Sequence, residues 1–548
     1  MNRKKSLFFV LCLLLMLSLF LAACTPKESS KPAPASGEGE KKEAIEKPQQ
    51  GGDLIVGSTG SPTLFNPLYS TDTSSTDIEG FIYDGLVSAD TEFEPALHLA
   101  EDIQQSEDGL TYTVKIRKGV TFHDGEELSA DDVIFTYSIP LNKDYAGERG
   151  SSFDMIESIN KVDEYTVDFK LKQKDASFYA VSLSYGILPE HILKDVPVAD
   201  LGENEFNTKK PVGTGPFKFA EWKDGQYVKV VANEDYFLGR PHLDSVTYKI
   251  VPDMDALIAQ LQAGDVHYVP AVPSTDIETV KNFKGIKVES GLGLNYSYIG
   301  WNEKNELFQD VKVRQALTHA IDRETIVASV LNGEGEVAHV PESPLSWAYS
   351  NDVPKFGYDT EKAKQLLGEA GWKDSNGDGI LDKEGKKFSF TLKTNQGNKV
   401  REDVAVIVQQ QLKEVGIEVK PEIVEWSAFI EQISAPNWNY EAMILGWSLA
   451  TFPDQYDIFH SSQMEQGLNF VWWENEEADK LINEARQILD REEYKNAYTD
   501  IYKIIAEEQP YTFLYYPNVH NAMPDALEGY EFHAKNDFYK IYHWWLRK

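Results

Sequence analysis

Hydrophobic and polar positions alternate along this chain with two different periods, and each period predicts one kind of element. A period of two predicts a strand, because neighbouring side chains of a strand point to opposite faces. The segments that show this period are 53–58, 111–116 and 161–172. A Gly-Pro turn within 212–222 leads into a further strand. We also interpret the apolar run 442–445 as a strand.

Other segments show the apolar spacing and the end signals of helices. Ser129 and Asp132 form an approximate capping box, which predicts that a helix begins there. An apolar stripe in 313–331 predicts a helix that is capped again at Asp322. The segment 358–372 has an aspartate at its start and a glycine near its end, as a complete helix should. Helices and strands mix throughout and no tandem repeat is visible, so we predict an α/β fold with more than one sheet.

The stretch after the last of these strands raises a functional question. In "GWSLATFPDQYDIFHSS" (446–462), a tryptophan, a glycine, a proline and two carboxylates follow the apolar run directly. The strand ends either in a ligand pocket or only in a loop, and the pattern alone leaves both open.

Charge and length narrow the class of protein. The chain has 548 residues and a net charge of −35, from 88 acidic against 53 basic residues. Roughly 150 residues per domain suggests three or four folded units. Nucleic-acid binding is not expected, because polyanion binding needs clustered Lys and Arg.

The N-terminus differs from the rest in composition. Residues 1–23 begin with basic residues, continue as an uncharged apolar run and end in small residues, as a secretory signal peptide does. "LAAC" at 21–24 resembles a bacterial lipobox, after which cleavage leaves a lipid-modified Cys24 at the new N-terminus. Residues 24–50 are rich in Pro, Lys, Glu and Ser, which predicts a flexible tether. A plain signal anchor is the alternative.

Motifs of catalysis and cofactor binding are not found. The sequence has no G-x-S-x-G elbow, no H-E-x-x-H pair and no Walker A loop. A calcium loop is weakly suggested, but Gly385 stands where such a loop needs a bidentate glutamate. Its candidate ligands are Asp374, Asn376, Asp378 and Asp382. We expect no cofactor and no metal, and a hydrolase built on a pair of acids stays open as a rival class.

Several motifs together carry a resemblance to a known family. They are "TFHDGEELSADDVIFTYS", "GTGPFKF", "DVKVRQALTHAIDRETIV" and "YDTEKAKQLLGEAGW". In this order they resemble the family 5 peptide-binding proteins of bacterial ABC importers, over essentially Gly52 to the C-terminus. The chain is most similar to the App-type oligopeptide-binding lipoproteins of bacilli, through "GWSLATFPDQYDIFHSS" and "KTNQGNKVRED".

The resemblance implies a two-lobed clamshell of the type II periplasmic-binding-protein class, with mixed sheets and an extra inserted domain. Lobe I would be discontinuous, comprising 51–85, 206–290 and 510–548. The inserted domain would span 86–205, and lobe II would span 291–509.

The resemblance also implies a function without catalysis. The protein would be a monomeric receptor, lipid-anchored on the outer face of a Gram-positive cell membrane, that delivers oligopeptides to ABC importer permease subunits. Peptide would join exposed strand edges between the closing lobes. The same fold with an oligosaccharide or a metal chelate as ligand is the alternative.

Candidate binding residues follow from the same resemblance. One edge would be Gly446, Trp447 and Ser448, and the other would be Ser70, Thr71 and Asp72. Tyr298 and Trp347 are further candidates for the cleft, with core packing as the alternative for both and for Trp447.

One position departs from the family pattern. Many relatives have an aspartate three residues after the tryptophan, where it pairs with the α-ammonium of the peptide, and this chain has Ala450. Either Asp454 or Asp457 substitutes for it, or the peptide N-terminus is not clamped there. We favour the second hypothesis, which predicts that N-terminally blocked peptides are tolerated.

Overall fold

The largest sheet of the structure contains both antiparallel and parallel strands. This computed structural model describes residues 47–434, 436–465 and 467–548. The strands follow the order β11-β19-β12-β18-β16-β17, and β13 pairs with β19. Their bounds are Ile286–Leu292 (β11), Asn295–Trp301 (β12), Gly335–Val337 (β13), Ser389–Asn395 (β16), Glu418–Val424 (β17), Ala442–Ser448 (β18) and Tyr511–Pro524 (β19).

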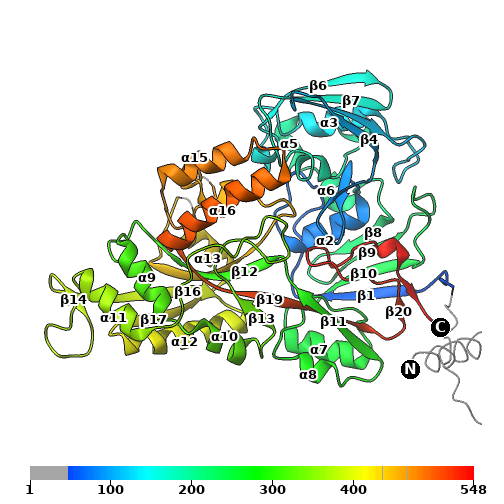
Figure 1. The fold of residues 1–548 in the computed structure, drawn as a ribbon. Helices are drawn as coiled ribbons and strands as arrows, with labels where there is room; N and C mark the ends of the chain where they lie inside the picture. Colours follow the sequence, from blue (N-terminus) through cyan, green and yellow to red (C-terminus); the bar gives the residue numbers. More distant parts are fainter. Residues whose placement is uncertain (1–46, 435, 466) are drawn as a thin grey trace, which may run out of the picture. The chain divides into compact units, whose positions relative to one another are not determined.

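Strand β19 belongs to two groups of elements at once. Its first part pairs antiparallel with β12, up to Tyr515. Its second part, from Asn518 to Pro524, pairs antiparallel with β11. The strand therefore runs from the region predicted as lobe II into the region predicted as lobe I (Figure 1).

The parallel part of this sheet has α/β connections. β16 pairs parallel with β17 and with β18, and helix α12 (Lys399–Glu414) connects β16 to β17 and packs against both (Figure 1). The chain then returns through α13 (Trp426–Ile433) to β18, on the other side of β16. The direction of progression across the sheet thus reverses between β16 and β18.

Two further sheets have four strands each. The first has the order β1-β10-β9-β8, and the second β4-β5-β7-β6. The strand bounds are Asp53–Ser58 (β1), Ala100–Gln105 (β4), Thr111–Ile116 (β5), Ile156–Asp163 (β6), Thr166–Leu171 (β7), Phe217–Lys223 (β8), Tyr227–Ala232 (β9) and Ser245–Ile250 (β10). Two-stranded ribbons join Val87–Ala89 (β2) to Pro95–Leu97 (β3), Asp382–Lys383 (β14) to Lys386–Lys387 (β15), and Leu527–Glu528 (β20) to Trp545–Leu546 (β21).

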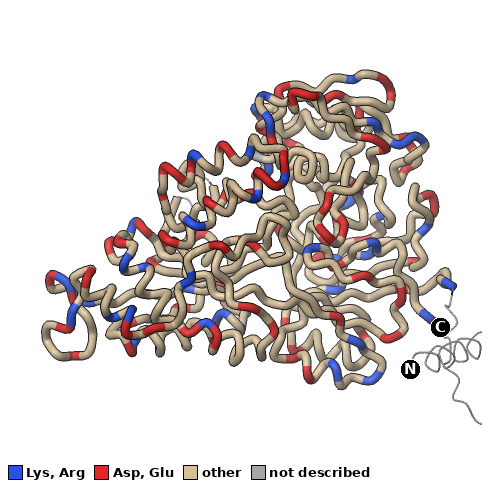
Figure 2. The backbone as a smooth tube through the Cα atoms, in the orientation of Figure 1, with Lys and Arg blue, Asp and Glu red and all other residues tan. Residues whose placement is uncertain are grey.

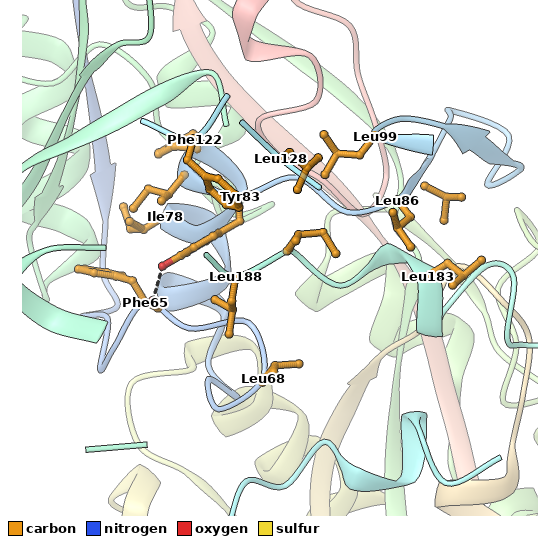
Figure 3. Close-up of a cluster of buried hydrophobic side chains, with 14 of the residues drawn as sticks. Phe65, Leu68, Ile78, Tyr83, Leu86, Leu99, Phe122, Leu128, Leu183 and Leu188 are labelled. Atoms are coloured by element: carbon orange, nitrogen blue, oxygen red, sulfur yellow. Dashed lines mark hydrogen bonds between the residues drawn. The ribbon is translucent and has the colours of Figure 1, made fainter. Parts of the chain in front are cut away.

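These two four-stranded sheets share one hydrophobic core. Figure 3 shows part of it, where aromatic and aliphatic side chains from several segments meet. The hydroxyl of Tyr83 donates a hydrogen bond of 3.0 Å to the carbonyl of Phe65 within this cluster. The buried polar group is therefore satisfied without a break in the core.

Three helices begin where the sequence predicts their starts. Ser129 and Asp132 form a capping box at α3, Asp322 caps α10, and Asp359 caps α11. Gly371 follows α11 with a φ of 91°, the left-handed conformation that favours glycine after a helix. The remaining helix bounds are Thr73–Ile82 (α2), Ala130–Ser138 (α3), Glu190–Leu193 (α4), Val198–Leu201 (α5), Phe206–Lys209 (α6), Met254–Ala263 (α7), Ile277–Val280 (α8), Val311–His319 (α9), Arg323–Val330 (α10), Thr360–Glu369 (α11), Tyr456–Phe459 (α14), Glu476–Ala485 (α15) and Arg491–Glu508 (α16).

The prediction of one strand over 161–172 is wrong. The segment contains the end of β6, a tight turn and the whole of β7, which pairs antiparallel with β6. Asp163 accepts a hydrogen bond of 2.8 Å from the N–H of Tyr165 and so stabilises the turn. Val162, which the alternation places inside, is 56% exposed. The alternation continues on both sides of the turn, so the period alone does not reveal the break.

The predicted signal peptide 1–23, Cys24 and most of the tether 24–50 lie outside the described residues. Among the residues that the structure describes, no helix has the length and apolar character needed to cross a membrane.

A buried carboxyl group gives the fold a pH dependence. Glu342 is 1% exposed, and it accepts hydrogen bonds from the N–H of Ser343 (3.0 Å) and the hydroxyl of Tyr502 (3.3 Å). Within the described residues no basic side chain forms an ion pair with it. Burial therefore raises the pKa of Glu342 from 4.5 to about 8.

We predict that the protein loses stability as the pH rises from about 4.5 to about 8. In this window folded Glu342 keeps its proton and the unfolded chain does not, so each rise in pH favours unfolding. Thermal unfolding followed by circular dichroism should show a melting temperature that falls across the window. Glu342→Gln should make the fall less steep, whereas Glu414→Gln, at an exposed helix end, should not. An equally steep fall in Glu342→Gln would contradict this assignment.

Candidate ligand-binding site

The C-terminal half of strand β18 has a free edge. On one side β18 pairs with β12 along its whole length, from Ala442 to Ser448. On the other side it pairs with β16 only at Ala442 and Met443. Beyond that point no strand of the described chain covers this edge.

The backbone groups of two predicted site residues point toward this free edge. In an antiparallel pair, successive residues of a strand direct their N–H and C=O groups alternately toward the partner and away from it. Leu449 donates to the carbonyl of Leu294 on the β12 side, at 2.9 Å. The carbonyl of Ile444 accepts from a hydroxyl on β16, the opposite side. The alternation therefore directs Gly446 and Ser448 away from β12, with their peptide groups available to another strand.

The topology independently favours a ligand at this place. In α/β sheets, ligands bind beyond the carboxyl ends of parallel strands where the direction of chain progression reverses. Here that reversal lies between β16 and β18, so the site falls at the last residues of both strands, Asn395 and Ser448.

Arg401, near the start of α12, is a candidate that the sequence interpretation did not single out. Its Nη1 donates to Asn395 Oδ1 at 2.7 Å. Its Nη2 lies 3.2 Å from the position that a Cβ at Gly446 would take. No carboxylate among the described residues forms an ion pair with it, and burial lowers its pKa. "KTNQGNKVRED" supported the resemblance, but which of its charged residues reaches β18 depends on how α12 packs.

Trp447 forms one aromatic wall beside the free edge. It is half-buried, and its ring is stacked on those of Tyr298 (6.3 Å between centroids) and Phe470 (5.6 Å). Its Nε1 donates to the hydroxyl of Tyr511 at 3.4 Å. These contacts hold the indole in one orientation while leaving part of it accessible.

The placement of Tyr298 in the cleft is wrong. Its side chain is 0% exposed and stacks on Tyr511 with 3.9 Å between ring centroids. Tyr298 therefore supports Trp447 from within the core.

The second predicted edge, Ser70–Asp72, is not a strand. The carbonyl of Ser70 accepts two hydrogen bonds from the guanidinium of Arg149, at 3.1 and 2.8 Å. The carboxylate of Asp72 caps α2 by accepting from the N–H of Ser75 at 2.8 Å. Thr71 is exposed between them. Because these groups are already bonded, Thr71 offers the accessible backbone of this segment.

The two aspartates after Trp447 lie in a different environment. Asp454 forms an ion pair with Arg486 (3.0 Å) and accepts from the hydroxyl of Tyr498 (2.8 Å). Desolvation raises the pKa of Asp457, and the charge of Asp454 raises it further. Asp454 therefore has its partners within the protein and is a poor substitute for an ammonium clamp at position 450.

Trp347 lines a cavity of about 380 Å³. Residues from β4, β5 and the segment before β3 form one side, and residues at the start of α16 form the other. The guanidinium of Arg491 lies over the Trp347 ring, 4.4 Å from its centroid, and pairs with Glu94 across the cavity. The remaining lining residues are mainly apolar or aromatic: Phe93, Pro95, Ile103, Gln105, Tyr112, Ala176, Tyr179, Ala180, Phe452, Ile488, Leu489 and Tyr494.

The weak calcium-loop candidate is stabilised by its own hydrogen bonds. Asp374 accepts from the N–H groups of Gly377 (2.7 Å) and Gly379 (2.9 Å), and Asp382 accepts from that of Ser375 (2.9 Å). Asn376 and Asp378 form similar short-range bonds. In the described part of the chain, no group of three or more His, Cys, Asp or Glu residues is placed to hold a metal ion.

Comparison with known proteins places this geometry in a family. Residues 94–469 match "Bacterial extracellular solute-binding proteins, family 5 Middle". The chain is 61% identical to the oligopeptide-binding protein AppA of Bacillus subtilis (strain 168), over 100% of both chains.

Two solved structures share the fold. The structure of AppA from Bacillus subtilis in complex with a nonapeptide is 64% identical, with a TM-score of 0.85, over 92% of this chain and 100% of that one. The structure of NikZ from Campylobacter jejuni in complex with Ni(L-His) is 28% identical, with a TM-score of 0.83, over 90% and 99%.

These findings confirm the predicted two-lobed, type II periplasmic-binding-protein fold and the resemblance that implied it. They also confirm a receptor of solutes in place of an acid-pair hydrolase. The predicted domain limits stay predictions. The chain belongs to the bacterial extracellular solute-binding proteins, family 5.

Proposed function

We propose that this protein binds extended oligopeptides and delivers them to an ABC importer. The observation that carries the proposal is the free edge of β18, where the peptide groups of Gly446 and Ser448 face away from β12. The identity of 61% to an oligopeptide-binding protein along the whole chain supports the same ligand class.

A free strand edge suits a ligand of variable sequence. Every peptide has the same backbone N–H and C=O groups, so a receptor that pairs with them accepts many sequences. Trp447 supplies a flat apolar surface beside the edge, and the cavity at Trp347 supplies room for apolar side chains. No covalent step is needed, and specificity comes from enclosure.

Native mass spectrometry of the purified protein, followed by denaturing release, tests the substrate class. We expect a mixture of peptides within a narrow range of lengths. Peptides incubated with the protein should be recovered unchanged, as they would be from a receptor. Release of oligosaccharides or of a metal chelate, without peptides, would contradict the proposal in favour of its alternatives on the same fold.

Gly446→Ala should weaken peptide binding about tenfold. The added Cβ would stand 2.9 Å from the carbonyl oxygen of Tyr296 and 3.2 Å from Nη2 of Arg401, so the strand edge has to shift. A shift of a few tenths of an ångström misaligns several backbone hydrogen bonds with the peptide at once. Isothermal titration with a peptide recovered from the protein measures the change.

Gly368→Ala is the matched control, because nothing lies within 4 Å of the Cβ that it adds. It should bind peptide as the wild type does. Unchanged affinity in Gly446→Ala, with the same melting temperature, would show that peptide does not pair with this edge.

Anchoring through Cys24 and delivery to a permease complete the proposed function. The lipobox-like "LAAC" supports the anchor, because a receptor of a cell without an outer membrane needs attachment to act there. The polar, Pro-rich tether predicted to follow would leave the folded part free to meet its permease.

Cys24→Ala should incorporate no labelled fatty acid, because the thiol that carries the lipid is lost. Wild-type protein should incorporate the label and remain with the membrane fraction, as measured by fractionation and gel autoradiography. Cys12→Ala, within the predicted signal peptide, is the matched control and should stay anchored. Fatty-acid label in Cys24→Ala equal to that in the wild type would refute the lipid anchor on Cys24.

A further inference from the structure

Two basic side chains bond to the two segments predicted to flank the peptide. Nζ of Lys535 donates to Oγ of Ser448, at the end of β18, with a distance of 2.8 Å. The guanidinium of Arg149 donates to the carbonyl of Ser70 at 2.8 and 3.1 Å. Lys535 thus lies at the free edge of β18, and Arg149 lies at the segment before α2.

The two cations lie close enough to affect each other. Desolvation by the surrounding protein and, to a smaller extent, the charge of Arg149 lower the pKa of Lys535 to about 8. Lys535 is nevertheless an exposed residue. Its ammonium group is therefore open to solvent beside the end of β18, where a ligand can reach it.

Neither cation has an acidic partner in the described part of the chain. No ion pair within 4.0 Å involves Lys535 or Arg149. The carboxyl group of Glu79 lies near Arg149, but burial raises the pKa of Glu79 to about 8. Glu79 is therefore largely protonated at neutral pH and cannot balance the charge.

An unbalanced pair of cations is unexpected in this protein. Acidic residues outnumber basic ones by 88 to 53 and are spread over the described elements (Figure 2). Two like charges at reduced hydration raise each other's energy, and an anion between them removes that cost.

The same charges disfavour an ammonium group beside Ser448. The segment from Trp447 to Pro453 contains no acid, so it has no carboxylate to pair with an ammonium group. An ammonium placed there would meet Lys535 with no counter-charge, whereas a carboxylate would accept charge-assisted hydrogen bonds.

We propose that Lys535 and Arg149 bind a carboxylate of the bound peptide next to Ser448. This inference rests on the proposed peptide-binding function. The carboxylate is either the C-terminus of the peptide or the side chain of an Asp or Glu residue within it, since both present the same group.

Isothermal titration of the intact protein with matched synthetic nonapeptides tests the inference. The parent peptide consists of Ser, Thr, Gln and Tyr with free termini. Its variants carry a C-terminal amide, an N-terminal acetyl group, or the amide with a single Gln→Glu change at successive positions. Acetylation should change the affinity of the wild type by less than about twofold.

Two results identify the source of the carboxylate. If it is the C-terminus, the amide should bind the wild type at least tenfold more weakly than the free acid. If it is a side chain, one Gln→Glu change should raise the affinity at least tenfold. In Lys535→Met and in Arg149→Met either effect should shrink to about twofold, because the positive charge is lost while much of the side-chain length is kept.

Controls separate charge from folding. Lys535→Arg keeps the charge and should keep the preference. Lys143→Met removes an exposed charge from the segment that precedes Arg149 and should behave as the wild type does. The neutral amide should bind Lys535→Met and wild type equally, which shows that the variant is folded.

The inference and the proposed function fail in different ways. If the wild type binds these peptides with no preference for any carboxylate, or if Lys535→Met keeps the full preference, the carboxylate site is wrong and peptide binding stands. A tenfold loss on acetylation would likewise overturn it, because it shows an ammonium clamp. If no peptide binds the wild type, the proposed function falls and this inference with it.

Discussion

The pairing of strand β19 with both β12 and β11 is the constraint on which the rest of the fold depends. Its first part pairs with β12. A buried hydrogen-bond network supports this part: the hydroxyl of Thr512 bonds with that of Thr318 (2.6 Å) and accepts from the indole N–H of Trp301 (3.2 Å). Its second part is fixed to β11. A continuous backbone thus joins the two groups of elements. Pro517, which has no N–H to donate, lies between the part paired with β12 and the part paired with β11, where β19 pairs with β13. If the two groups close on a ligand, as the proposed function implies, torsions near this crossover would have to change.

Much of the fold could be predicted because its signals are local. A cap such as Asp359 acts on N–H groups within three residues, so four or five letters of sequence contain the whole interaction. The segment 161–172 shows the limit of this reasoning. Its alternation indicates which side chains are buried. It does not reveal the turn, because the polar residues that form the turn could equally lie in an exposed strand. The order in which the strands pair could not be predicted, because it depends on contacts between residues far apart in the chain.

The candidate site also has residues that the sequence indicates and residues that only the structure brings together. Gly446 was found because it lies in a recognisable motif, and its geometry depends on a ladder that one strand partner determines. Tyr298 and Trp447 are both aromatic residues at strand positions, and only the packing of neighbouring rings buries one fully and leaves the other half-buried. Lys535 and Arg149 come from distant segments with no motif of their own. The resemblance showed only that an aspartate is absent at 450, and the structure shows which charges lie nearby.

The free edge of β18 has a consequence beyond ligand binding. An unpaired strand edge accepts any extended backbone, including that of another copy of the same protein, and is therefore a route to aggregation. Proteins often protect such edges with positive charges, and here Lys535 and Arg401 lie beside the exposed part. These cations would repel one another when two empty edges approach, while a peptide carrying a carboxylate would meet attraction. The charges that select a ligand would then also keep empty receptors from pairing with each other.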